Sequence, residues 1–454
     1  MKRVFVCITA VFLLLCVGCK TIDGTSSVIE ELTNIVEDNL LSEESSEDTS
    51  SVESLPPASA LSTPDTPSKP AQTVTPTTPT SPPNVIVETE IKDDEYVVVK
   101  PKPIVIKGDK PMSYEKLSDE QKRIYGILEA ALLDMVDENI DLQMNDASNV
   151  SNDLNVAFRA VSFDNPEMFW IPTGYALKQS GNRYFVAFKY SDSNSGVSYD
   201  YPVSKSERDN MKNTLDEKVN ELANAVKDKD SFEAELYIHD YLCQNVAYTL
   251  PAENEPEDPL IYTSYGALVN GKAVCEGYSR AMQLICDKLK IPCGLVYGWS
   301  QGVGHMWNII NPGDGWYHLD VTWDDDEMNG IISHRYFNIT KENIIYEDSQ
   351  CNGHTIADDF KKSKKYSDTD VFNFLSSDCN NTALNYFIRN NYTVSALDEK
   401  DVAFIKYIAD ECPLSFEIQN NSGKSAKEVV EFVIGVFNKG VAYYNSYNII
   451  TIIQ

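Results

Sequence analysis

The sequence from Tyr265 to Asp326 reads YGALVNGKAVCEGYSRAMQLICDKLKIPCGLVYGWSQGVGHMWNIINPGDGWYHLDVTWDDD. Its order of apolar and turn-forming residues predicts a loop, a helix that begins at a cysteine, a strand and then a β-hairpin. Cys275 therefore lies in the first turn of the predicted helix. One apolar helix face is indicated by residues that recur at intervals of four, three and four: Tyr278, Met282, Ile285 and Leu289.

The position of Cys275 suits a nucleophile. A thiol attacks as the thiolate, and the partial positive charge of a helix N-terminus, together with a nearby imidazole, lowers the pKa of a thiol. A lone cysteine at a helix start is more often a small buried side chain, so further residues must support the hypothesis. Cys286 and Cys293 are expected to be such packed side chains.

Two strand-like runs, Met306–Ile310 and Trp316–Trp323, flank the turn-forming residues NPGDG. If the turn centres between residues 312 and 313, paired numbers sum to 625, and His305 faces Asp320. Opposed Cβ atoms lie about 4.5–5.5 Å apart, which is close enough for the carboxylate to accept a hydrogen bond from one imidazole nitrogen and orient the ring. The other imidazole nitrogen is then the base that faces the thiol. A simple surface pair is the alternative. The order Cys, His, Asp favours a triad.

Several short motifs accompany these three side chains. They are GALV and GKAVCEGY within 266–278, GHMWN at 304–308, WYHLDVTWD at 316–324, IHDYL at 238–242, AY at 247–248 and PEMFW at 166–170. Together they resemble the transglutaminase-like superfamily, in the branch common in bacterial lipoproteins and related to the transglutaminase-like domain of cytokinesis-associated proteins. The close resemblance covers about residues 235–340. It implies that Cys275 is the nucleophile, His305 the general base and Asp320 the orienting residue, with no cofactor.

The resemblance also implies an α+β fold with a papain- or transglutaminase-like core. In such a core the helix that carries Cys275 packs on an antiparallel sheet that carries His305 and Asp320. We predict this core over residues 231–366, after an α+β region over 112–230 and before a small α/β unit over 367–454. Other predicted elements are a helix from Ser118, strands over 155–163 and 183–190, helices over 204–226 and 231–247, a helix over 425–438 and a strand over 447–453.

The N-terminus predicts export. Two basic residues, an apolar run from Val4 to Val17 and Gly18 are typical of a signal peptide over residues 1–18, and fourteen apolar residues are too few to span a bilayer. The residues LCVGC at 15–19 resemble a bacterial lipobox, with Leu15 one place early. Cys19 is therefore expected to be lipidated, which would anchor the chain to the outer face of the cytoplasmic membrane. Plain secretion or a retained N-terminal anchor are the alternatives.

Residues 21 to about 99 are dominated by Ser, Thr, Pro, Glu and Asp, which bury too little apolar surface to offset the entropy of ordering. We predict a disordered, lipid-anchored tether over residues 19–111. Thirty-eight basic and 69 acidic residues give a net charge of −31, which argues against nucleic-acid binding. The seven cysteines after Cys19 are an odd number without paired CxxC spacing, so we expect at least one free thiol rather than a disulfide scaffold or a zinc site.

Supporting residues are less clearly indicated. The backbone N–H of Cys275 and the side chain of Tyr265 or Trp170 are candidate donors for a tetrahedral oxyanion, although core packing is the more common role for either aromatic. His318 with Asp320 and His305 could bind a metal, but nucleophilic catalysis explains the cysteine better, so no metal is expected. The acidic run at 324–327 could bind calcium, but an exposed acidic loop is the more common case. His239 is expected to be structural, and His334 and His354 are uninformative.

These observations predict cysteine-dependent acyl transfer on amides. The thiolate of Cys275 would attack an amide carbonyl of a protein or peptide, including cell-wall peptides, and expel an amine. Attack on the thioester by an amine gives cross-linking, whereas attack by water gives hydrolysis, and the sequence leaves both open. A non-catalytic, surface-tethered binding or scaffold module that keeps only the fold is the alternative.

Overall fold

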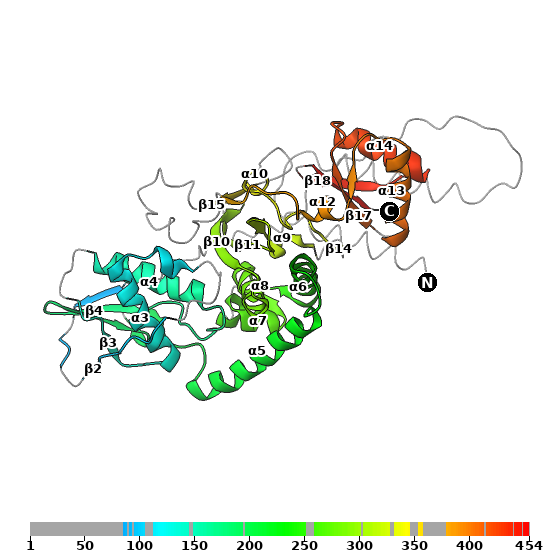
Figure 1. Ribbon diagram of the computed structural model, residues 1–454. Coiled ribbons are helices and arrows are strands. Elements are labelled where there is room, and N and C mark those ends of the chain that lie inside the picture. Colours follow the sequence, from blue (N-terminus) through cyan, green and yellow to red (C-terminus); the bar gives the residue numbers. More distant parts are fainter. Residues whose placement is uncertain are drawn as a thin grey trace, which may run out of the picture. The chain divides into compact units, whose positions relative to one another are not determined.

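The structure is a computed structural model of the chain, shown as a ribbon in Figure 1. It describes residues 85–88, 90–92, 95–104, 112–144, 149–193, 196–250, 258–300, 303–326, 331–345, 353–356, 378–412, 415–438, 440–446 and 448–453. The predicted signal peptide and Cys19 lie outside these residues. In the described part of the chain no helix has the length and apolar character needed to cross a membrane.

The helices, with the two 3-10 helices marked η, are η1 (Ser113–Lys116), α3 (Asp119–Asp134), α4 (Val150–Asp164), α5 (Lys205–Ala225), α6 (Ser231–Asn245), η2 (Pro259–Tyr262), α7 (Ser264–Leu268), α8 (Cys275–Leu289), α9 (Val321–Asp324), α10 (Lys341–Ile344), α12 (Tyr386–Arg389), α13 (Glu399–Glu411) and α14 (Ala426–Phe437). The strands are β1 (Val85–Glu88), β2 (Tyr96–Val97), β3 (Asn139–Asp141), β4 (Ala176–Ser180), β5 (Arg183–Ala187), β6 (Tyr190–Asp192), β7 (Val197–Tyr199), β8 (Ala247–Tyr248), β9 (Lys272–Ala273), β10 (Cys293–Ser300), β11 (Val303–Ile310), β12 (Tyr317–Leu319), β13 (Asp325–Asp326), β14 (Ile331–Ile332), β15 (His354–Ile356), β16 (Thr393–Val394), β17 (Ser415–Asn420), β18 (Ala442–Ser446) and β19 (Ile449–Ile453).

A five-stranded sheet, in the order β1-β4-β5-β3-β2, comes first in the chain. Its three inner strands are antiparallel, whereas β1 and β2 pair in parallel with β4 and β3 at the two edges. Both edge strands lie within residues 19–111, which we predicted to be a tether. Short runs rich in β-branched residues, such as VIV at 85–87, pair with a sheet even inside a polar segment. The predicted boundary at residue 112 is therefore too late.

Residues 155–163 belong to α4, so the strand predicted there is wrong. Nearly every side chain of this segment is buried: Val156, Ala157, Phe158, Ala160, Val161 and Phe163. A continuous apolar run does not distinguish a buried strand from a buried helix, and α4 is buried where it packs against α3. The strand predicted over 183–190 is confirmed by β5 and the first residue of β6.

Three predicted helices begin after a serine that caps them. Ser118, Ser204 and Ser425 each accept a hydrogen bond from the backbone N–H three residues on, and the Gln or Glu at that position accepts one from the serine's own N–H. This capping box satisfies backbone groups that a helix start leaves unpaired. The helices α3, α5 and α14 therefore begin within one residue of their predicted starts.

The central layer is the antiparallel sheet β12-β11-β10-β15, with α8 packed across β11 and β10 (Figure 1). The predicted apolar face of α8 points into this contact, because Tyr278, Met282 and Ile285 are fully buried. Burying such side chains stabilises the chain by roughly 1.5–3 kcal/mol each. The predicted α+β class, with a helix that carries the cysteine on an antiparallel sheet, is confirmed.

One continuous cluster of buried side chains runs from Leu117 to Phe337. The predicted regions 112–230 and 231–366 therefore share a hydrophobic core and do not pack as separate units. A second cluster, from Val394 to Ile452, belongs to the sheet β16-β17-β19-β18 and to α13 and α14. It is the core of the small C-terminal unit, whose predicted helix and strand correspond to α14 and β19.

Candidate active site

Cys275 is the first residue of α8 and is half-buried. The chain reaches it through Gly271, whose φ of +65° is rarely adopted by residues with a side chain, and through β9, which pairs with β8. The predicted position of Cys275 at a helix start is confirmed. Cys286 and Cys293, predicted to be packed side chains, are fully buried.

Gly277, in the first turn of α8, allows the helix to lie against the preceding loop. A Cβ at this position would be 2.6 Å from the carbonyl oxygen of Ile261 and 2.7 Å from the Cβ of Ala273. Backbone atoms cannot yield as a flexible side chain can, so we expect Gly277→Ala to lower the free energy of unfolding by about 1–3 kcal/mol. Denaturation with urea measures this change.

Gly435→Ala is the matched control, because it replaces a helical glycine in α14 around which no described atom lies within 4 Å of the new Cβ. That variant should be as stable as the wild type or more stable by up to about 1 kcal/mol, owing to the helix propensity of alanine. Equal stability of the two variants would contradict the close contact at Gly277.

The start of α8 is joined to β11 beside the predicted base. The hydroxyl of Ser279 lies 2.8 Å from the carbonyl oxygen of Cys275 and 3.0 Å from that of Met306. The amide nitrogen of Asn308 donates to the carbonyl of Ser279 at 3.0 Å. Because Met306 directly follows His305, these contacts determine how the cysteine and the histidine face each other.

His305 and Asp320 meet with 2.6 Å between Nε2 and Oδ2, but not through the predicted register. Asn308 pairs with Leu319, so paired numbers sum to 627 and not to 625. The strand also ends earlier than predicted: Asp320 caps α9 and accepts from the backbone N–H of Trp323 at 3.1 Å. A shift of two residues leaves a side chain on the same face, which explains why the contact exists despite the incorrect register.

His354 contacts Asp320 as well. From β15, its Nε2 lies 2.7 Å from the same Oδ2 that contacts His305, and all three side chains are buried. Burial lowers the pKa of His354. The hydrogen bond and charge of Asp320 raise this pKa, and the charge of His305 lowers it, so that the net shift is downward. A neutral ring that donates through Nε2 is therefore favoured. Sequence reasoning missed this residue because the contact spans 34 positions and depends on the pairing of β15 with β10.

The buried pair of His305 and Asp320 is charged. Burial alone would lower the pKa of His305. The charge of Asp320, its hydrogen bond and a hydrogen bond with the thiol of Cys275 outweigh that effect and raise the pKa to about 10. Burial raises the pKa of Asp320, whereas the charge and hydrogen bond of His305 and the hydrogen bond of His354 bring it below its ordinary value. With Nε2 on Asp320, Nδ1 of His305 remains for Cys275. The imidazole thus keeps its proton at neutral pH, between a carboxylate and a thiol.

Aromatic side chains enclose this group. The indole of Trp307 stacks on His305 with ring centres 5.7 Å apart and an angle of 20°. Burial raises the pKa of Tyr248, on β8, and electrostatic interactions with Cys275 and Asp320 raise it further. Because His305 and Asp320 are buried, the electrostatic interaction between them is stronger than it would be in water. The sequence identifies Tyr248 only as part of a motif and indicates no role for it at the site.

The two aromatic side chains considered as oxyanion donors, Trp170 and Tyr265, have different contacts in the structure. Trp170 donates its single N–H to the carbonyl of Leu132 at 2.9 Å and is buried, so its indole is not available to a substrate and it has the core-packing role that is more common for an aromatic side chain. Tyr265 packs on Phe169 with ring centres 4.9 Å apart. Its role as a donor stays a prediction, as does that of the Cys275 backbone N–H.

Other predicted polar residues have structural contacts. His318 accepts from the indole N–H of Trp307 through Nδ1 at 3.0 Å, and His354 rather than His318 joins Asp320. Asp324 and Asp325 are buried, so the exposed acidic loop predicted there is wrong for both. The prediction that His239 is structural is confirmed, because both of its ring nitrogens contact carboxylates.

Comparison with known proteins supports the resemblance inferred from the motifs. Residues 220–321 match the family described as the transglutaminase-like superfamily. One solved structure, from Cytophaga hutchinsonii and named provisionally as a cysteine protease, is 17% identical over 24% of this chain and 37% of its own, with a TM-score of 0.20. Another, named as a TGase, is 15% identical over 41% of this chain and 52% of its own, with a TM-score of 0.23. No curated protein matches the chain.

Proposed function

Because residues 220–321 match the transglutaminase-like superfamily, we propose that this chain is a cysteine enzyme that transfers acyl groups from amide substrates, with Cys275 as its nucleophile. The main support is the contact of 2.6 Å between His305 and Asp320 beside the start of α8. A thiol at a helix N-terminus, an imidazolium and a buried carboxylate are the groups that such chemistry requires. A binding module needs none of them, and burying them without a use for their charges is costly.

In the first half of the proposed reaction, the thiolate of Cys275 attacks the carbonyl carbon of an amide. The tetrahedral intermediate collapses when the carbon–nitrogen bond breaks and the leaving amine takes the proton from Nδ1 of His305. The acyl group is then held as a thioester, and His305 is neutral. In the second half, an amine or water gives a proton to His305 as it attacks the thioester, and the sulfur leaves as the thiolate.

Asp320 serves both halves without changing its own charge. It stabilises the imidazolium form of His305 and orients the ring so that Nδ1 faces the sulfur. His354 donates to the same carboxylate oxygen and restrains its position. Tyr248, on β8, interacts electrostatically with Cys275 and Asp320.

We further propose that the chain acts outside the cytoplasm, on proteins or peptides that include cell-wall peptides. The support is the export signal at residues 1–18 and the lipobox-like LCVGC, with Cys19 as the membrane anchor. A lipid anchor followed by a Pro-rich segment would hold the enzyme at the membrane while leaving it free to reach substrates nearby.

The proposal is tested by incubating the whole chain with glutamine-containing peptides, with and without a primary amine, and by following peptides and intact protein by mass spectrometry. We expect a covalent acyl adduct on the protein, together with amine incorporation for a transferase, or cleavage or deamidation of peptides for a hydrolase. Protein whose thiols have been blocked with iodoacetamide is the control and should yield none of these products. An active chain that forms no adduct and is insensitive to the blocking reagent would overturn the proposal.

A further inference from the structure

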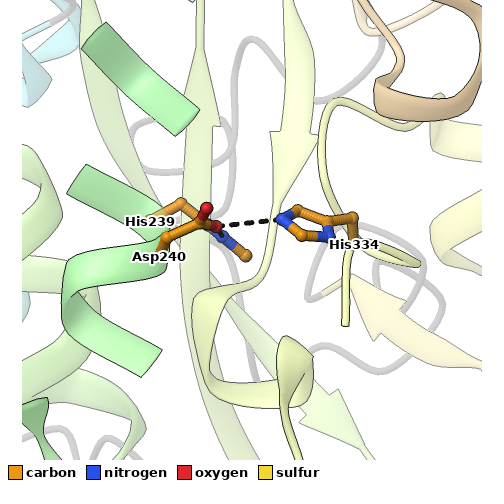
Figure 2. Close-up of side chains that lie close together, drawn as sticks. All are labelled: His239, Asp240 and His334. Carbon is orange, nitrogen blue, oxygen red and sulfur yellow. Dashed lines mark hydrogen bonds and ion pairs between the residues drawn. The ribbon is translucent and has the colours of Figure 1, made fainter. Parts of the chain in front are cut away.

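A second group of polar side chains lies outside the Cys275 site, on α6 and on the segment after β14. It consists of His239, Asp240 and His334, which point toward one another in Figure 2. Oδ1 of Asp240 lies 2.9 Å from Nδ1 of His239 and 2.9 Å from Nε2 of His334. The three possible ligand atoms are all within 4.8 Å of one another. Two imidazole nitrogens and one carboxylate oxygen thus converge on one point.

The other contacts of the two histidines do not use the converging atoms, which contact one another through Asp240. His239 is fully buried, and its other nitrogen, Nε2, lies 3.2 Å from Oδ2 of Asp324. That carboxylate accepts from the backbone N–H of Tyr336 at 3.0 Å. A carboxylate on the far side of a histidine is the usual partner of a metal-binding imidazole, because it holds the proton on the outer nitrogen and turns the inner lone pair toward the metal.

His334 is positioned by contacts that do not use its Nε2. Its ring stacks on Tyr386 with ring centres 3.8 Å apart and an angle of 7°. Its backbone N–H donates to Oε2 of Glu417 at 2.9 Å. Both rings are therefore held in place before any ion binds, which lowers the entropy that binding would cost.

We propose that His239 Nδ1, Asp240 Oδ1 and His334 Nε2 bind one divalent transition-metal ion of the Zn²⁺ type. Nitrogen ligands with one carboxylate favour such an ion over Ca²⁺ or Mg²⁺, which prefer oxygen ligands. Tetrahedral ligands of Zn²⁺ lie about 3.3 Å apart, so each contact of 2.9 Å needs to lengthen by only about 0.4 Å. The protons now shared with Asp240 pass to solvent when the metal binds. The side chain of Asp240 is 34% exposed, so water can reach the fourth position.

The role of this ion is structural, and its position explains what it would stabilise. Asp324 ends the four-residue helix α9, and Asp320, the carboxylate that contacts His305, caps the start of the same helix. The ion would join α6 to the segment that carries His334 and, through His239 and Asp324, would restrain α9. The ion itself contacts neither Cys275 nor His305 in this arrangement.

The experiment measures zinc in the untagged whole chain after equilibration with ZnCl₂ and removal of loosely bound ions. We expect about one Zn²⁺ per wild-type chain and at least a fivefold lower content in His334→Gln and in Asp240→Asn. The matched control is His305→Gln, because His305, Asp320 and His354 form the other His–Asp–His group found in the described residues. This variant should keep its zinc.

Two further measurements accompany the zinc analysis. Circular dichroism checks that each variant is folded, and Co²⁺ absorption of the wild-type chain reports the site without any substitution. Intense visible bands of a four-coordinate Co²⁺ complex support the proposal, whereas the weak bands of octahedral Co²⁺ overturn it. A wild-type chain without zinc, folded variants that keep it, or loss of zinc only in His305→Gln would each overturn the proposal as well.

Discussion

Replacing Cys275 by alanine is expected to abolish acyl transfer while leaving the chain folded. The fall in kcat/KM should be at least about 10⁴-fold, because the thioester cannot form and His305 has no other nucleophile to activate. Cys275 is half-buried at the first position of α8, and alanine keeps its Cβ, so the substitution removes little packing. The measurement is the rate of product formation by mass spectrometry, with circular dichroism to compare the folds of the two proteins.

The chain offers a matched control for this variant. Cys412 carries an exposed thiol at the end of α13 in the C-terminal unit. Cys412→Ala should keep wild-type activity and should still be inactivated by iodoacetamide. A Cys275→Ala protein that retains more than a tenth of the activity, or an equal loss in both variants, would show that the nucleophile lies elsewhere.

The parts of the fold that depend on local physics could be predicted from sequence. The capping serines define the starts of α3, α5 and α14, since each cap satisfies backbone groups within the same four residues. The start of α8 at Cys275 follows in the same way from Gly271 and from the apolar spacing after the cysteine. These signals act over one or two helical turns and need no tertiary context.

The errors arose where a contact depends on tertiary structure. The apolar run at 155–163 fits a strand or a buried helix, and only the packing of α4 against α3 decides between them. The hairpin register differed by two residues because the five-residue turn cluster permits more than one pairing, and Asp320 then left the strand to cap α9. His354 had no local signal at all, since only the pairing of β15 with β10 brings it to Asp320.

The same tertiary contacts determine the charges at the site. Asp320 is almost fully buried, and its Oδ2 contacts two imidazoles, at 2.6 Å and 2.7 Å. A charge-assisted hydrogen bond in such surroundings is stronger than one in water. The carboxylate therefore controls the protonation state of His305 and not only the orientation of its ring. Removing that charge should affect both the rate and its pH dependence.

We expect Asp320→Asn to lower kcat/KM by about 10²–10⁴-fold at neutral pH. The amide keeps the size of the side chain but removes the negative charge that holds the proton on His305. The imidazoles of His305 and His354 both need an acceptor at this position, whereas the amide has one oxygen that accepts and one nitrogen that donates. The orientation of the His305 ring is therefore less well fixed in the variant. The control is Asp314→Asn in the hairpin turn, where the side chain is exposed and accepts from the hydroxyl of Tyr317. That variant should keep full activity.

The pH profile separates this role from a merely structural one. With the pKa of His305 raised to about 10, the stability contributed by the ion pair is complete below the ordinary histidine pKa of about 6.5 and is lost as the pH rises through about 10. Wild-type activity, which needs the imidazolium form of His305, should fall on the alkaline side as the pH rises through about 10. The lowered pKa of Asp320 adds stability that is present above about 3.9 and is lost in acid. In Asp320→Asn the burial of His305 remains without the opposing charge, so the alkaline limb of kcat/KM should move down by about 1–3 pH units. A variant that loses activity but keeps the wild-type alkaline limb would mean that Asp320 only supports the fold, and that another group sets the charge of His305.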